Sequence, residues 1–182
     1  MTEITQIRLS GFGGQGVVLA GILLGEAGAI DGKHVAGSNS YGAQARGSDC
    51  KSEIVLSDGS IDFPHLTTSD ILVSMSQGAY DLYCVDVKED SGLILYDQNL
   101  VSPRKDLKVK QLGVPATEVS VKKLKNKQVA NIVLLGVLIE TLKIVSPKAM
   151  QKAIALHVSQ RFRALNLKAL RIGMELGRRT HG

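Results

Sequence analysis

The clearest chemical pattern in the sequence is a glycine-rich stretch near its start, Gly11-Phe12-Gly13-Gly14-Gln15-Gly16. It follows a segment typical of a strand (residues 4–10) and precedes an apolar segment typical of a helix (residues 17–30). Glycine admits positive φ angles and lets a ligand approach the backbone closely. The free N–H groups at the start of a helix attract anions. The pattern predicts a phosphate-binding loop, and a tight turn that only packs the helix on the strand is the alternative.

A second polar loop, residues 38–48, follows a short predicted strand at residues 33–37. We expect the first two strands to be parallel neighbours in a right-handed unit, so that both loops leave the sheet at its carboxyl edge. Arg46 lies between small residues in this loop and could reach an anion there; a solvated arginine in an ordinary mobile loop is the alternative. The predicted ligand-binding residues are Gly11, Gly13, Gly14, Gln15 and Gly16 from the first loop, and Ser40, Tyr41, Gln44 and Arg46 from the second.

The identity of the ligand depends on what accompanies the glycines. A nicotinamide dinucleotide site usually has an acidic residue at the end of the second strand, to bind the ribose. That strand here ends in Gly37-Ser38-Asn39, and no Lys-Ser/Thr pair follows Gly16, as a Walker A loop requires. A free-standing NAD(P)- or nucleotide-binding enzyme is therefore the alternative rather than the first choice.

The rest of the chain offers no chemical machinery of its own. There is no GxSxG motif, and the four histidines are scattered without metal-ligand spacing. We interpret His157 as a core histidine because it falls on the apolar side of a predicted helix. We predict no catalytic residue and no metal ligand, which indicates a component that binds while other chains react.

Composition narrows the class of protein. The 182 residues fit one domain spanning residues 1–182, and the formal net charge of +5 is a mild bias towards anionic ligands or acidic partner proteins. Aromatic residues make up 4%, and the basic clusters at residues 104–110 and 122–127 lack a nucleic-acid motif, so they indicate a solvated surface. The two cysteines form no CxxC, and the start of the chain has no signal-peptide core. The longest strongly apolar run, residues 132–139, is too short to span a bilayer. We expect a cytoplasmic protein that binds neither nucleic acid nor membrane.

The order of apolar segments predicts the fold class. Strand-like segments alternate with helical ones in the first two thirds, and helices follow one another in the last third. Asp58-Gly59 is a hairpin signal that predicts one antiparallel strand pair. Ser146-Pro147 is typical of a helix start, with Val145 and Met150 placed to form a hydrophobic staple. We expect a single Rossmann-like α/β domain, with a mostly parallel sheet and helices on both faces.

Taken together, the motifs resemble the gamma subunit of 2-oxoacid:ferredoxin oxidoreductases over nearly the whole chain. The resemblance rests on Gly11 to Val17 with Leu19-Ala20-Gly21, on Ser40-Tyr41-Gly42 with Ala45-Arg46-Gly47, and on Ile61-Asp62-Phe63-Pro64. The sequence is most similar to the 2-oxoglutarate type, whose second loop typically has Pro, Glu and Gly where this chain has Ala43, Gln44 and Ser48. The departure leaves 2-oxoglutarate, branched-chain 2-oxoacids, pyruvate and indolepyruvate open as substrates.

The resemblance implies a complex with alpha and beta subunits, and often a small ferredoxin-like delta subunit. Such a complex decarboxylates a 2-oxoacid on thiamine diphosphate, passes two electrons through iron–sulfur clusters to ferredoxin, and transfers the acyl group to coenzyme A. The gamma domain is associated with coenzyme A binding and with assembly. The Gly-Asp-Gly magnesium motif and the cluster-binding cysteines of such enzymes are absent from this sequence, so these cofactors are expected on partner subunits and the isolated chain is expected to be inactive.

Overall fold

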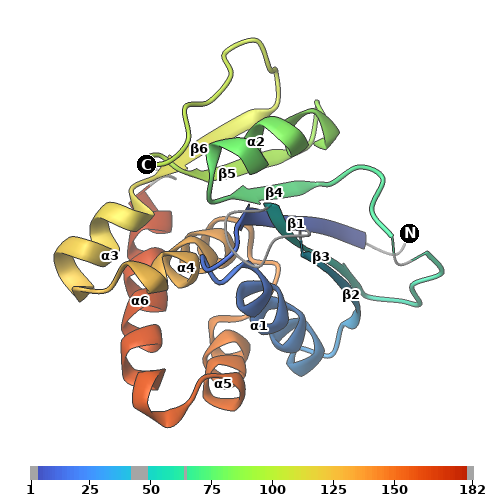
Figure 1. Cartoon of the computed structure of the whole chain (residues 1–182). Helices are drawn as coiled ribbons and strands as arrows, with labels where there is room; N and C mark the ends of the chain where they lie inside the picture. Colours follow the sequence, from blue (N-terminus) through green and yellow to red (C-terminus); the bar gives the residue numbers. More distant parts are fainter. Residues whose placement is uncertain (1–3, 42–48, 64, 180–182) are drawn as a thin grey trace.

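The computed structural model of the protein describes residues 4–41, 49–63 and 65–179. Six strands form one sheet in the order β2-β3-β1-β4-β5-β6 (Figure 1). The strands are β1 (Ile4–Phe12), β2 (His34–Tyr41), β3 (Asp49–Ser57), β4 (Ile71–Ser74), β5 (Leu93–Asp97) and β6 (Lys110–Val114). The helices are α1 (Val17–Ile30), α2 (Gln77–Tyr83), α3 (Ala116–Leu124), α4 (Ala130–Leu142), α5 (Pro147–His157) and α6 (Gln160–Arg179). Short 3₁₀ turns follow α2 (η1, Cys84–Asp86) and precede α4 (η2, Lys127–Val129).

The sheet is mostly parallel, as predicted. Strands β1, β4, β5 and β6 pair in parallel, and β2 runs in the same direction as β1 because both are antiparallel to β3. The expectation that the first two strands are neighbours was wrong, because β3 lies between them and pairs with both. The carboxyl ends of β1 and β2 nevertheless reach the same edge of the sheet, since Phe12 and Tyr41 flank Asp49 and Cys50 at the start of β3.

The antiparallel pair forms at a different turn from the predicted one. Strands β2 and β3 pair over eight positions, from His34 opposite Ser57 to Tyr41 opposite Cys50, and the segment between them lies outside the described residues. Asp58-Gly59 instead makes a local turn in which the Gly59 N–H donates to Ser57 Oγ at 3.1 Å. The turn signal was real, but no strand follows it until β4, because the chain must first cross to the other side of β1.

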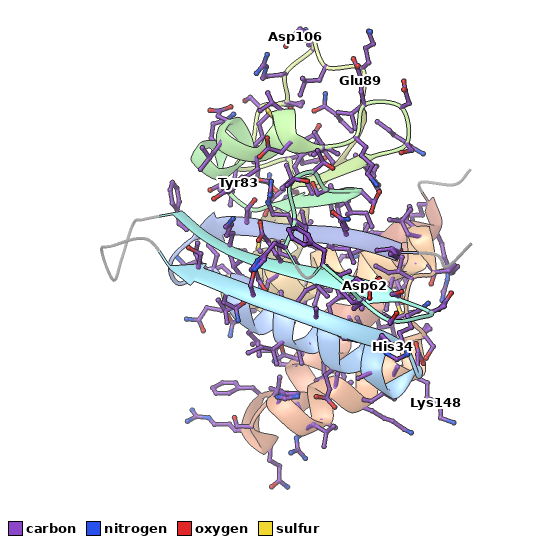
Figure 2. All side chains as sticks on the ribbon, turned by 90° about the vertical axis from the view of Figure 1, so that its right-hand side faces the viewer. His34, Asp62, Tyr83, Glu89, Asp106 and Lys148 are labelled. Carbon is purple, nitrogen blue, oxygen red and sulfur yellow. The ribbon has the colours of Figure 1, made fainter. Side chains whose placement is uncertain are left out.

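Helices cover both faces of the sheet, as predicted. One face packs on α1, with α3 to α6 on the same side, and the other face packs on α2 (Figure 1). Alternation along the strands supplies both cores: Ile71 and Val73 of β4 join the α1 side, and Leu72 joins Tyr80 and Cys84 on the α2 side. Figure 2 views the sheet from edge strand β2, with Tyr83 on the α2 side and Lys148 on the opposite side, beyond α1.

Glycines allow two close contacts in the larger core. A Cβ on Gly21 of α1 would overlap Ser52 Oγ, and one on Gly28 would lie 2.6 Å from Leu56 Cδ2, so α1 lies directly against β3. Helices α4 and α6 cross where Gly136 and Gly173 face each other, and a Cβ on Gly173 would overlap the carbonyl oxygen of Val133. The crossing of α4 and α6 brings backbone against backbone, and α4 is buried nearly all round.

The start of α5 matches its sequence signal, whereas its last turn does not. Ser146 Oγ accepts a hydrogen bond from Ala149 N–H at 3.1 Å, and both Val145 and Met150 are buried in the same core cluster. His157 was interpreted as a core residue, but it lies on the surface with Nε2 3.0 Å from Glu26 Oε2. Ile154, one turn earlier in α5, is buried. Position 157 lies beyond it, at the edge of the contact between α5 and α1.

None of the helices in the described part of the chain combines the length and the apolar character needed to cross a membrane.

Candidate ligand site at the glycine loop

The glycine loop lies at the point in the sheet where the helices that follow neighbouring strands change from one face to the other. Strands β1 and β4 are parallel neighbours, but β1 continues into α1 on one face and β4 continues into α2 on the other. Such a switch point opens a crevice outside the carboxyl ends of the strands, where open α/β sheets bind their ligands. The sequence-predicted loop thus occupies the position in this fold that is best suited to a ligand.

The loop depends on two glycines with positive φ angles. Gly14 has φ +97°, and Gly16, which precedes the first residue of α1, has φ +75°. No atom lies within 4 Å of the place where a Cβ on Gly14 would stand, so packing does not require glycine at this position. The backbone conformation does, because residues with a Cβ rarely adopt it.

Gln15 braces the loop against the sheet. Its side-chain Oε1 accepts a hydrogen bond from Phe12 N–H at 2.6 Å, and its Nε2 donates to the carbonyl oxygen of Met75 at 2.6 Å. Gly11 makes room for this arrangement, since a Cβ there would lie 2.5 Å from Gln15 Oε1. Of the predicted ligand-binding residues, Gln15 and Gly11 therefore shape the loop, and the Gln15 amide is already occupied by protein groups.

A residue that the sequence reasoning missed fastens the other side of the loop. Asn131, buried near the start of α4, donates from Nδ2 to the carbonyl oxygen of Gly16 at 3.0 Å and accepts from Ile132 N–H at Oδ1 at 2.9 Å. A Cβ on Gly16 would overlap that same amide nitrogen. The contact joins residues 115 positions apart, so no local sequence signal could reveal it.

Several backbone donors of the loop remain available. Gln15 N–H closes a turn to Phe12 at 3.1 Å, whereas the N–H groups of Gly13, Gly14 and Gly16 donate to no residue that the structure describes. Gly13 and Gly14 are exposed, at the positively charged end of the α1 dipole. The loop therefore presents unpaired donors to the crevice, as an anion site requires.

Hollows lie on both sides of the loop. The smaller, about 330 Å³, is bounded by Gly13, Gly14 and Gly16 together with the side chains of Phe12, Val17, Val18, Leu19 and Cys50. The larger, about 480 Å³, extends from Gly13, Gly14 and Gln15 across the carboxyl ends of β4 and β5 to Met75, Asp97, Leu100, Thr117, Lys127, Gln128 and Ala130. Both volumes fall within or near the range of small-molecule sites, about 300–1,000 Å³.

The larger hollow contains a carboxylate that sequence reasoning did not single out. Asp97, buried at the end of β5, accepts hydrogen bonds from Thr117 N–H at 2.9 Å, Thr117 Oγ1 at 2.5 Å and Asn99 N–H at 3.1 Å. These bonds attach the first turn of α3 to β5 and satisfy the charge of the carboxylate. Lys127, exposed on the rim, supplies a cation with no ion-pair partner among the described residues.

The second loop was predicted from residue 38, but β2 continues to Tyr41, so Ser38 to Tyr41 belong to the strand and bring its end beside the glycine loop. Tyr41 is opposite Cys50 in the register of β2 and β3, and Phe12 is opposite Asp49 in that of β1 and β3. Ser40 is exposed near the end of β2, at the same edge as the glycine loop. Gln44 and Arg46 lie outside the described residues, so their assignment to the ligand stays a prediction.

The two cysteines cannot act together. Cys50 belongs to the core on the α1 side of the sheet and Cys84 to the core on the α2 side, and both are free thiols. Burial raises the pKa of each thiol, so both are protonated at neutral pH. Across the described ranges no three His, Cys, Asp or Glu side chains come together to form a metal site.

Comparison with known proteins identifies the family. Residues 6–176 match the family described as pyruvate ferredoxin/flavodoxin oxidoreductase. A 2-oxoglutarate synthase subunit, KorC, from Methanocaldococcus jannaschii is 46% identical over 176 residues, which cover 95% of this chain and 94% of the relative. Identity at this level over nearly all of both chains shows common ancestry.

Solved structures agree with the sequence match. The crystal structure of the gamma subunit of a keto/oxoacid ferredoxin oxidoreductase from Geobacter sulfurreducens is 37% identical, with a TM-score of 0.84 over 95% of this chain and 98% of that one. The 2-oxoglutarate:ferredoxin oxidoreductase from Magnetococcus marinus, solved with 2-oxoglutarate, coenzyme A and succinyl-CoA bound, shares the fold with a TM-score of 0.87 at 21% identity, over 97% of this chain and 31% of that one. The chain therefore belongs to the pyruvate ferredoxin/flavodoxin oxidoreductase family, as a gamma-type subunit of a 2-oxoacid:ferredoxin oxidoreductase.

Proposed function

We propose that this chain contributes the coenzyme A site, together with part of the assembly surface, to a complex that oxidatively decarboxylates 2-oxoglutarate to an acyl-CoA and reduces ferredoxin. The observation that carries the proposal is the set of N–H groups on Gly13, Gly14 and Gly16, which donate to none of the described residues and lie at the switch point of the sheet, between two hollows. The relative named as a 2-oxoglutarate synthase subunit supports the choice of substrate.

Coenzyme A matches the chemistry of this edge of the sheet. Its pyrophosphate and 3′-phosphate are anions of the kind that helix N-termini and arginine bind. In the proposed pose, the backbone of residues 13–16 binds phosphate oxygens and Arg46 pairs with a phosphate. Ser40 and Gln44 act as polar supports, and Tyr41 packs on the pantetheine arm or the adenine. The apolar lining of the smaller hollow, from Phe12, Val18 and Leu19, suits the less polar parts of the ligand.

The redox cofactors fit partner subunits better than this chain. The sequence contains no Gly-Asp-Gly motif for magnesium-bound thiamine diphosphate, and its two cysteines face opposite sides of the sheet. We therefore assign thiamine diphosphate, magnesium and the iron–sulfur clusters to alpha, beta and, where present, delta subunits. We place the complex in the cytoplasm, which the unpaired cysteines favour.

Arg46→Ala in the reconstituted complex tests the ligand assignment. Because a charge-assisted hydrogen bond contributes about 1.5–3 kcal/mol, we expect the KM for coenzyme A to rise roughly 10- to 150-fold while the KM for 2-oxoglutarate stays nearly constant. Arg104→Ala is the matched control, since Arg104 pairs with Asp106 on a separate loop. A change in the 2-oxoglutarate KM instead would place Arg46 in the substrate pocket.

Two further measurements separate this function from the alternatives. Gly14→Val should weaken coenzyme A binding more than Arg46→Ala, because it strains a positive φ angle and places a branched side chain where the phosphate approaches. The purified chain alone should not oxidise 2-oxoacids when supplied with thiamine diphosphate, magnesium, coenzyme A and a viologen dye. Turnover by this chain at about 1 s⁻¹, or tight binding of NADH in place of coenzyme A, would contradict the subunit role.

A further inference from the structure

The net positive charge of the chain comes from the segment that contains its last two helices, α5 and α6. Residues 147–182 contain eight Lys and Arg and one acidic residue, Glu175. Residues 1–146 contain 14 Lys and Arg against 16 Asp and Glu. The formal net charge of +5 therefore combines a segment of +7 with a remainder of −2. Such segregation gives one side of the molecule a strong positive potential, which a well-mixed surface lacks.

A groove between α5 and α6 concentrates this charge. Gln151 of α5 forms one wall of a hollow of about 700 Å³, and the remaining lining belongs to α6. The α6 residues are Ala164, Leu167, Lys168, Leu170, Arg171, Met174 and Arg178. Most of them are three or four positions apart, so they follow one face of the helix. The groove thus has an apolar floor with three cations beside it and no acidic residue in its lining.

Two of the three groove cations have no partner within the described part of the protein, and the third shares a carboxylate with a lysine. Lys168 and Arg171 are exposed and have no ion-pair or hydrogen-bond partner among the described residues. Arg178 lies 3.4 Å from Glu140 Oε1, which also accepts a shorter bond of 2.7 Å from Lys143. Leu167 is 38% exposed between these charges. Apolar side chains exposed among unpaired cations form a surface complementary to an acidic, amphipathic partner.

We propose that the α5–α6 groove docks an acidic amphipathic helix of another subunit of the same oxidoreductase. Leu167 and Met174 would receive its apolar positions, and Lys168, Arg171 and Arg178 would pair with carboxylates at helical spacing. The proposal rests on the assembly role in the proposed function, but it involves no residue of the glycine loop.

Two observations favour a protein segment over the other polyanions. Nucleic acid would gain from phosphate contacts and stacking platforms, yet the groove lining contains no aromatic residue and has an apolar floor. The Methanocaldococcus jannaschii relative, of which 94% is covered by the match, is named as a 2-oxoglutarate synthase subunit, so other subunits of the same enzyme are available as partners.

The double variant Lys168→Glu/Arg171→Glu tests the proposal. The subunits of the complex are expressed together and separately, and the dissociation constant of this chain from the others is measured at two salt concentrations. We expect the double variant to bind at least about tenfold more weakly, because each reversal replaces attraction by repulsion. The wild-type affinity should fall with salt, since exposed charges are screened. Lys105→Glu/Lys110→Glu near β6 is the matched control and should bind like the wild type.

A carbodiimide that joins amines to carboxylates at zero length identifies the partner. Wild-type Lys168 should cross-link to an Asp or Glu of another subunit, and Lys168→Arg should lose the cross-link but keep the affinity. Melting temperatures equal to that of the wild-type chain show that Lys168→Glu/Arg171→Glu and Lys168→Arg both fold.

Three outcomes would overturn the proposal. They are an affinity of the double variant within about twofold of the wild type, the absence of any cross-link at Lys168, and binding of RNA or anionic vesicles that depends on Lys168 and Arg171 while assembly does not. The coenzyme A KM is read in parallel. If the double variant weakens assembly while Arg46→Ala leaves the coenzyme A KM unchanged, only the ligand role is refuted. If Arg46→Ala raises the coenzyme A KM while the double variant assembles normally, only the docking site is refuted.

Discussion

Replacing Asn131 tests whether the glycine loop is shaped from a distance. The Asn131→Ala variant loses two hydrogen bonds, from Nδ2 to the Gly16 carbonyl at 3.0 Å and from Ile132 N–H to Oδ1 at 2.9 Å. A typical hydrogen bond contributes about 1 kcal/mol net, and a buried donor left without a partner costs about 1–3 kcal/mol. Gly16 keeps its bond from Ala20 N–H at 2.9 Å, so only the Ile132 N–H is at risk of remaining unpaired. We expect the free energy of unfolding to fall by about 2–3 kcal/mol.

The measurement is urea denaturation of the isolated chain, together with coenzyme A kinetics of the complex. Asn131→Asp separates the two bonds, because it keeps the acceptor for Ile132 and places an oxygen against the Gly16 carbonyl. Asn126→Ala is the control: it removes an ordinary cap of η2, in which Asn126 Oδ1 accepts from Gln128 N–H at 2.9 Å, and should cost about 1 kcal/mol. A loss under about 0.5 kcal/mol in Asn131→Ala, with an unchanged coenzyme A KM, would refute the idea that α4 positions the loop.

Two more perturbations follow from the packing and the charges. Gly173→Ala should destabilise the chain by about 2 kcal/mol in thermal or urea melts, because its methyl group would overlap the Val133 carbonyl and this overpacking outweighs the gain in helix propensity. Gly25→Ala is the control: its Cβ would lie an ordinary 3.4 Å from Val35 Cγ1, so it should be neutral or stabilising. Burial raises the pKa of Glu53, but hydrogen bonds from Lys51 and Arg8 outweigh burial, so the pKa lies below its ordinary value. A lowered pKa in the folded state adds stability above the ordinary glutamate pKa of about 4.3, and this is lost as pH falls through the folded value. The difference in unfolding free energy between wild type and Glu53→Gln should therefore shrink between about pH 6 and pH 3, and a constant difference would show that the network does not titrate with folding.

What the sequence predicted well were features decided by neighbouring residues. The strand before Gly11, the turn at residues 11–16, the helix after it and the Ser146 cap all depend on residue types a few positions apart. The structure has each of them, with the one difference that β1 continues two residues beyond the predicted strand, to Phe12.

What the sequence could not predict were contacts made across the chain. The insertion of β3 between β1 and β2 depends on a pairing that the strong turn signal at Asp58-Gly59 does not encode. The contribution of Asn131 to the loop and that of Asp97 to α3 depend on elements brought together only by the whole sheet. The prediction of a core position for His157 was wrong because helical periodicity shows which side of α5 the residue lies on. It does not show whether the neighbouring helix extends far enough to cover that side.

The position of β1 has a consequence for the order of events during synthesis. This strand is made before both of its partners, since it pairs with β3 on one side and β4 on the other, and its second partner arrives about 60 residues later. At a synthesis rate of about 5–20 residues per second, β1 waits roughly 3–12 seconds for β4. The brace from Gln15 needs Met75, and the contact to Gly16 needs Asn131. The glycine loop leaves the ribosome before Met75 and Asn131, so it is among the last parts of the domain to reach its final shape. Until then its glycines are accessible to any chaperone or protease that binds the nascent chain.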